Sequence, residues 1–115
     1  MNLFALSSSG KINYLDVSTG TTLFSWRIHG STQPGCIALA RNDMVIAASD
    51  GSSVSFWDTT THEQIGSIIK HTAYIKSMAI STNYDLAMSG GKAITLRNIF
   101  GVLPSTYYEN VSKLA

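Results

Sequence analysis

The chain has 115 residues, 44% of them hydrophobic and 13% charged, and its formal net charge at pH 7 is +1. This composition indicates a folded globular chain, and it excludes a disordered tail and a basic nucleic-acid-binding domain. The single cysteine, Cys36, cannot form a disulfide within the chain, which favours an intracellular, cytoplasmic protein. Neither a signal peptide nor an apolar run of about 18 residues is visible, so we expect no membrane partner.

Three segments of the chain resemble one another at a period of about forty residues. Each contains a serine in an apolar stretch, and these serines lie 42 and 40 residues apart at Ser7, Ser49 and Ser89. An alanine precedes each serine by two positions, at Ala5, Ala47 and Ala87. A repeat of this length lies in the range of the four-stranded sheet, or blade, of a β-propeller, and one such unit cannot bury its own faces.

Residues 1–29 are predicted to form three strands, at residues 3–6, 12–16 and 22–28. In the second of these, apolar Ile12 and Tyr14 alternate with polar Asn13, and a period of two is typical of a β-strand. Polar and glycine-containing segments between the strands predict turns that reverse the chain. We expect residues 1–29 to be a partial blade that lacks its inner strand.

Residues 35–70 carry the signals of a complete blade, with an inner strand at residues 36–40 and an outer strand at residues 64–70. Residues 74–115 repeat this order from an inner strand at residues 77–81. The segment in the position of their outer strand, residues 104–111, opens with a proline, which suits only a strand start or an edge. The third blade is therefore predicted with an undecided outer strand and a C-terminal tail. Helices are not expected, because β-branched and aromatic residues dominate the periodic segments and turns recur too often.

A histidine after one strand, an alternating inner strand, a serine, a tight turn and a strand ending in Trp57-Asp58 together resemble the WD-repeat family of β-propellers. Residues 29–58 match this order best. Residues 71–81 are similar to the opening segment of the family, although the later strand of that unit ends in Arg97-Asn98 without a tryptophan. The resemblance implies an all-β chain, a partial WD-repeat-like β-propeller built of four-stranded antiparallel blades.

The resemblance also implies structural roles for some polar side chains. In this family a histidine, a serine, a turn aspartate and a tryptophan form a hydrogen-bonded network inside each blade, which satisfies buried polar groups together. The residues that match these positions here are His29, Ser49, Trp57, His71 and Ser89. The position of the turn aspartate holds Gly51 and Gly91 in the later units, so these networks are expected to be incomplete.

Catalytic chemistry is not predicted. His29 and His71 could be read as general bases or metal ligands, but no carboxylate lies at repeat-equivalent spacing and no Cys/His/Asp cluster surrounds them. Gly90-Gly91-Lys92 lacks both the following hydroxyl residue and the helix of a phosphate-binding loop, and it is interpreted as a hairpin turn. We therefore expect no enzyme activity, no cofactor and no metal.

The incomplete repeat leads to the functional hypothesis. A propeller typically needs at least four blades to close, and an open stack leaves apolar faces at both ends. The sequence therefore predicts a fragment of a non-catalytic protein-interaction scaffold, completed by a longer chain or by self-association into a homo-oligomer, with no nucleic-acid partner. Candidate protein-binding residues are Gln33, Tyr74, Tyr107 and Tyr108. The alternative is a small-ligand or carbohydrate-binding propeller, in which each repeat contributes a shallow site.

Overall fold

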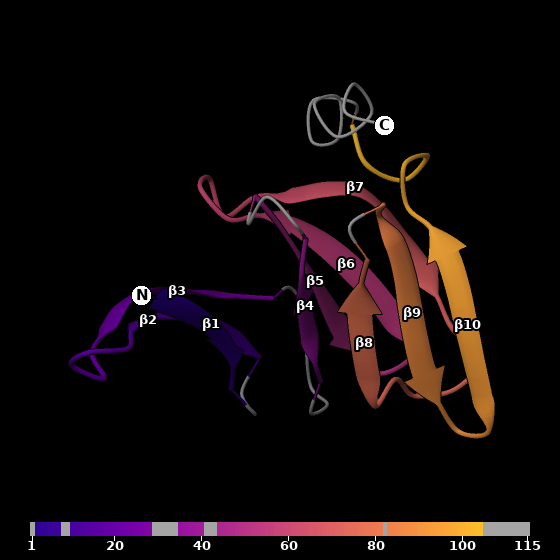
Figure 1. The fold of residues 1–115 in the computed structure, drawn as a ribbon, viewed down its shortest axis with the longest axis horizontal. Coiled ribbons are helices and arrows are strands. Elements are labelled where there is room, and N and C mark those ends of the chain that lie inside the picture. Colours follow the sequence, from indigo (N-terminus) through magenta and orange to yellow (C-terminus); the bar gives the residue numbers. More distant parts are fainter. Residues whose placement is uncertain (1, 8–9, 29–34, 41–43, 82, 105–115) are drawn as a thin grey trace.

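The computed structural model describes residues 2–7, 10–28, 35–40, 44–81 and 83–104. These residues form ten β-strands and no helix, and the strands are arranged in three antiparallel sheets that stand side by side (Figure 1). The all-β prediction is confirmed. The described residues contain no helix that is long and apolar enough to cross a membrane.

The first sheet contains β1 (Asn2–Leu6), β2 (Lys11–Asp16) and β3 (Thr22–Arg27), in the spatial order β1-β2-β3. Alternation along the strands places apolar residues in two cross-strand rows on one face. One row is Phe4, Tyr14 and Phe24, and the next row is Leu6, Ile12 and Trp26. No described strand pairs with the free edge of β1, the edge at which an inner strand would lie.

The second sheet contains β4 (Ile37–Leu39), β5 (Val45–Asp50), β6 (Ser53–Asp58) and β7 (Gln64–Lys70), in sequence order. Its β5 is buried on both faces from Val45 to Ser49. Such a strand needs apolar or small residues at every position, which explains the run Val-Ile-Ala-Ala-Ser in place of an alternating pattern. The second sheet is therefore the middle layer of the three.

The third sheet contains β8 (Ser77–Ile80), β9 (Asp85–Gly90) and β10 (Ala93–Asn98), in the order β10-β9-β8. In β9 every second residue is buried, because only one face of this sheet is covered by a neighbouring sheet. Ala87 is accordingly half-buried, whereas its repeat counterpart Ala47 is inaccessible to solvent. Most of the predicted outer strand lies outside the described residues, and Pro104 itself follows a turn.

Two apolar cores join the sheets. The first and second sheets enclose one of them, built around Ile12, Ile46 and Trp57. The larger core lies between the second and third sheets and includes Phe56 and Tyr84, both completely buried. Burying apolar surface contributes about 25 cal/mol per Å², so the contacts between sheets are the main source of stability. Strands β4 and β8, the inner strands of their sheets, contact each other at the centre of the arrangement (Figure 1).

Candidate functional site

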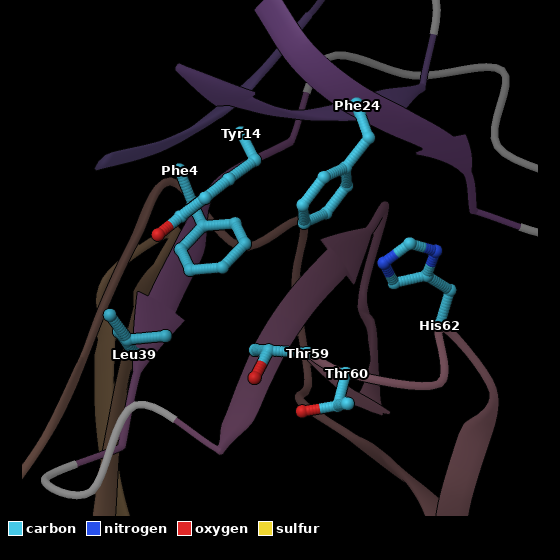
Figure 2. A pocket seen from close by; sticks show the side chains of 7 residues that line it. All are labelled: Phe4, Tyr14, Phe24, Leu39, Thr59, Thr60 and His62. Atoms are coloured by element: carbon cyan, nitrogen blue, oxygen red, sulfur yellow. The ribbon is translucent and has the colours of Figure 1, made fainter. Parts of the chain in front are cut away.

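A cavity of about 460 Å³ opens between the first and second sheets. Its walls come from three places: the aromatic row of the first sheet, the end of β4, and the turn between β6 and β7. Figure 2 shows the side chains that surround this common space: Phe4, Tyr14, Phe24, Leu39, Thr59, Thr60 and His62. The volume falls within the range of 300–1,000 Å³ that is usual for small-ligand sites.

The aromatic side chains of this cavity form one continuous row, in which Phe4 is tilted by 42° against Tyr14 and the other neighbours are stacked. The ring centroids of Phe4 and Tyr14 are 4.6 Å apart, and those of Tyr14 and Phe24 are 4.8 Å apart with planes inclined by 26°. His62 from the second sheet continues the row, because its imidazole lies 4.7 Å from the Phe24 ring at 29°. The row arises because cross-strand neighbours in a sheet bring their side chains close together.

A capped turn places His62 against the first sheet. The backbone N–H groups of Thr60 and Thr61 donate to Oδ1 of Asp58 at 2.7 and 2.9 Å, and the His62 N–H donates to the Asp58 carbonyl at 2.9 Å. The resulting turn holds His62 at φ 63°, in the left-handed region that L residues rarely adopt.

The equivalent turn of the first sheet has a glycine at this position. Gly20 donates to the Asp16 carbonyl at 2.8 Å, and Oδ1 of Asp16 accepts from Ser18, so the two turns share one hydrogen-bond pattern. The bonds from the Ser18 hydroxyl and N–H hold the pKa of the Asp16 carboxyl below its ordinary value of 3.8. Gly20 has φ 74°, which costs glycine little. His62 therefore occupies a position whose backbone geometry favours glycine.

His71, predicted as a network residue, is buried between the second and third sheets. Its Nδ1 lies 3.2 Å from Oγ1 of Thr95, and its Nε2 lies 3.4 Å from the carbonyl oxygen of Gly90. A carbonyl can only accept, so Nε2 carries the proton and Nδ1 accepts from the threonine hydroxyl. The ring thus bonds to the residue that follows Ser89 and to a hydroxyl of β10, and it ties β7 to the third sheet.

Ser49, also predicted for the network, is completely buried and holds the start of the inner strand. Its Oγ accepts from the Cys36 N–H at 2.7 Å, and its own N–H donates to the Cys36 carbonyl at 2.9 Å. A Cβ on the preceding Gly35 would collide with the carbonyl oxygen of Ser49, so this approach requires glycine. His29, its expected partner, lies outside the described residues.

The indole N–H of Trp57 finds its hydrogen-bond acceptor within the same strand. Its Nε1 donates to Oγ of Ser55 at 2.8 Å, and that oxygen lies 3.5 Å from the carbonyl of Ala48. Sequence reasoning did not assign Ser55 or Thr95 to the network, although both occupy the same polar position of the repeat. Because residues two apart on a strand share a face, the pair Ser55 and Trp57 was visible in the pattern.

Similarity to known proteins is found with solved structures. No protein-family model matches the chain, and no curated protein matches it. Among solved structures, the WD40 repeats of RRP9 superpose with a TM-score of 0.72 at 13% identity, over 89% of this chain and 33% of that one. The described residues have the fold of neighbouring blades of a WD40 β-propeller. Their three sheets correspond to blades of such a propeller, and they are called the first, second and third blades below.

Other solved structures share this arrangement at low identity. The crystal structure of the mitotic checkpoint complex contains a chain with TM-score 0.71 and 20% identity, matched over 90% of this chain and 33% of that one. Hydrazine synthase of Kuenenia stuttgartiensis contains a chain with TM-score 0.74 and 17% identity, matched over 88% and 30%. The chain thus spans about a third of the length of the solved chains that it matches.

Of the other predicted binding residues, Tyr74 is among the described residues and does not line the cavity. Tyr74 is 65% exposed in the loop that joins the second blade to the third, and its ring packs over Gly51. Gln33, Tyr107 and Tyr108 lie outside the described residues, so their role as binding residues stays a prediction. Among the residues that the structure describes, no group of three or more His, Cys, Asp or Glu side chains could hold a metal ion.

Proposed function

We propose that the chain is part of a non-catalytic protein-interaction scaffold, an open propeller that is completed by further blades of a longer chain or by other copies of itself. The observation that carries this proposal is the apolar outer face of the third blade. On it Ile94 is 80% exposed and Leu96 is 73% exposed. Both residues point away from the core that the third blade shares with the second.

The outer face of the third blade is suited to packing against another sheet. Leu96 lies in register with Ala87, and Ala87 with Ala79, so a row of apolar and small side chains crosses the three strands. Burial of a large aliphatic side chain contributes about 1.5–3 kcal/mol. Two such side chains left in water are therefore a substantial driving force for association.

The outer face of the first blade has the same character. Leu3 is 43% exposed and Leu23 is 50% exposed, and both lie on the face opposite the aromatic row. Arrays of repeats normally end in units with a polar outer face. Apolar residues at both ends of the segment support completion by neighbouring blades.

The hydrogen bonding of His71 supports the non-catalytic part of the proposal. A general base must reach a substrate proton with a free nitrogen. Here both ring nitrogens are within bonding distance of Thr95 and Gly90, and the side chain is only 7% exposed. The ring therefore serves to join the second and third blades, a structural role that the family resemblance implies.

The mass of the chain in solution tests the proposal. We expect concentration-dependent association: a discrete dimer or trimer supports completion by other copies, and heterogeneous association supports a segment of a longer propeller. The double variant Ile94→Glu with Leu96→Glu should shift the population toward monomer, whereas Ser67→Glu, at an exposed position of β7, should not. A compact wild-type monomer over the whole concentration range would contradict the proposal.

A further inference from the structure

We propose that the cavity between the first and second blades binds one aromatic side chain, from a Phe, Tyr or Trp in a peptide segment of the protein partner. The inference rests on the proposed scaffold function and adds a site and a partner chemistry to it. It is carried by the row of rings formed by Phe4, Tyr14, Phe24 and His62. Three properties of the cavity support it, namely its shape, its aromatic lining and its lack of formal charge.

The shape fits one large side chain. The cavity measures about 460 Å³ and is closed by the first blade on one side and by Leu39 and the turn at Thr59 and Thr60 on the other (Figure 2). It remains open to solvent at its mouth, so a segment of another protein can insert a side chain. Buried aromatic anchors that fill such pockets dominate the binding energy of many protein interfaces.

The four rings contact one another along the row, and all of them line the cavity. Tyr14 is flanked by Phe4 and Phe24, and Phe24 is flanked by Tyr14 and His62. Tyr14 and Phe24 therefore lie inside the row, where the planes of neighbouring rings are inclined by 26° to 42°. A ring edge carries partial positive charge and a ring face partial negative charge, so an incoming aromatic ring is attracted in an edge-to-face arrangement.

The lining of the cavity disfavours a sugar. The hydroxyl groups of a sugar each need a hydrogen-bond partner when they are buried. The polar groups of the cavity are the hydroxyls of Tyr14, Thr59 and Thr60 and the imidazole of His62, and the seven lining residues include no Asp, Glu, Lys or Arg. Such a lining matches a neutral ring, with the hydroxyl of Thr60 and the imidazole placed to bond to a peptide backbone or a phenol.

The backbone of His62 points to the same site. An L residue at φ 63° is strained, and the matching turn of the first blade has Gly20 in this conformation with no atom near its missing side chain. At His62 the imidazole completes the row and lines the cavity. Strained backbone positions are concentrated at ligand sites.

Titration of the isotopically labelled chain by nuclear magnetic resonance tests the inference. The probes are blocked pentapeptides Gly-Gly-X-Gly-Gly with Trp, Phe, Leu or Ala at X, and methyl glucoside as the sugar. We expect the Trp and Phe peptides to shift the amide signals of Phe24, Leu39 and Thr60, with affinity in the millimolar range because one side chain supplies few contacts. The Leu peptide should bind about fivefold more weakly, and the Ala peptide and the sugar should not saturate.

Two variants locate the binding. Thr60→Trp places a bulky ring at the mouth of the cavity and should abolish the shifts, whereas Thr72→Trp, at an exposed turn outside the cavity, should leave them unchanged. Dispersed spectra of both variants confirm folding. Equal binding of Leu, binding of the sugar in preference to Trp, persistence of the shifts in Thr60→Trp, or no shift with any probe would each overturn the inference.

Failure of the aromatic site can be distinguished from failure of the proposed scaffold function. The scaffold proposal is judged by the mass of the chain and by the variants on the outer face of the third blade, which lies on the opposite side of the segment from this cavity. Association that depends on Ile94 and Leu96 with no peptide binding would remove only the aromatic site. Saturable peptide binding by a compact monomer would support the site and contradict completion of the propeller by blades at its ends.

Discussion

The imidazole of His62 lies parallel to the indole of Trp26, with ring centroids 4.4 Å apart and planes inclined by 3°. The two residues belong to different blades, since Trp26 is in β3 and His62 is in the turn that follows β6. Their contact therefore attaches the end of the second blade to the first. Aromatic pairs of this kind contribute about 0.5–1.5 kcal/mol beyond the area that they bury.

Substitutions of His62 separate the stacking from the backbone strain. His62→Ala loses the stacking and keeps the left-handed backbone, whereas His62→Gly loses the stacking and relieves the strain. We expect the alanine variant to be the less stable of the two by about 1 kcal/mol, the cost of this conformation for an L residue. Urea unfolding monitored by tryptophan fluorescence measures both.

Gly20→Ala is the matched control for this comparison, because its turn has the same hydrogen bonds and open space around the position. It should destabilise the chain by about 1 kcal/mol through the backbone alone. An alanine variant of His62 that is as stable as the glycine variant would show that the turn relaxes out of the left-handed region.

The strands were predictable because alternation reports which residues share a face. It does not report whether another sheet covers that face. Val54 and Phe56 in β6 and their repeat counterparts Ile94 and Leu96 in β10 follow the same pattern, yet the first pair is inaccessible to solvent and the second is largely exposed. Burial depends on the neighbouring blade, which a periodic pattern within one strand does not encode.

The cavity could not be predicted for a related reason. Its walls combine Tyr14, Leu39 and His62, which are distant in the sequence and meet only when two blades pack together. The predicted hydrogen-bonded network differs from the cavity, because its members were named from the repeat itself. The sequence identified His71 and Trp57 as buried polar side chains, but their hydrogen-bond partners depend on side-chain geometry that repeat spacing does not contain.

The bond between His71 and Thr95 is expected to stabilise the junction of the second and third blades. Thr95→Val keeps the shape of the side chain and removes the hydroxyl, which leaves Nδ1 of the buried ring without its donor. We expect a loss of about 1–3 kcal/mol in the free energy of unfolding. Thr22→Val, at an exposed strand position, is the control and should change stability by less than about 0.5 kcal/mol. Equal effects of the two variants would mean that the bond contributes nothing.

The close approach of Gly90 to the preceding loop provides a second test of the same junction. A Cβ on Gly90 would collide with the carbonyl oxygen of Tyr74, and its backbone conformation is not one that favours glycine. Gly90→Ala must therefore displace the loop, and we expect a loss of about 1–3 kcal/mol. Gly101→Ala has no atom within 4 Å of the new Cβ and should be nearly neutral. Thermal unfolding of both variants compares their stability. An unchanged melting temperature of Gly90→Ala would show that the loop moves aside without loss of stability.

The two tryptophans differ in how their indole N–H groups are satisfied. Trp57 donates to Ser55 at 2.8 Å, whereas Nε1 of Trp26 is buried and has no hydrogen-bond partner in the described structure. A buried donor without an acceptor costs free energy, so its removal offsets part of the packing lost when the ring shrinks. Trp26→Phe should accordingly be tolerated better than Trp57→Phe.

The expected difference between these two variants is about 1 kcal/mol or more, the net contribution of one hydrogen bond together with the penalty that Trp26 no longer carries. Both variants exchange an indole for a phenyl ring, so the change in side-chain size is matched. Chemical unfolding followed by circular dichroism is the appropriate measurement, because each variant alters the fluorescence. Greater damage from Trp26→Phe would mean that stacking of the Trp26 indole on His62 outweighs the missing hydrogen bond, and would make the contact between these two rings the principal attachment of the first blade.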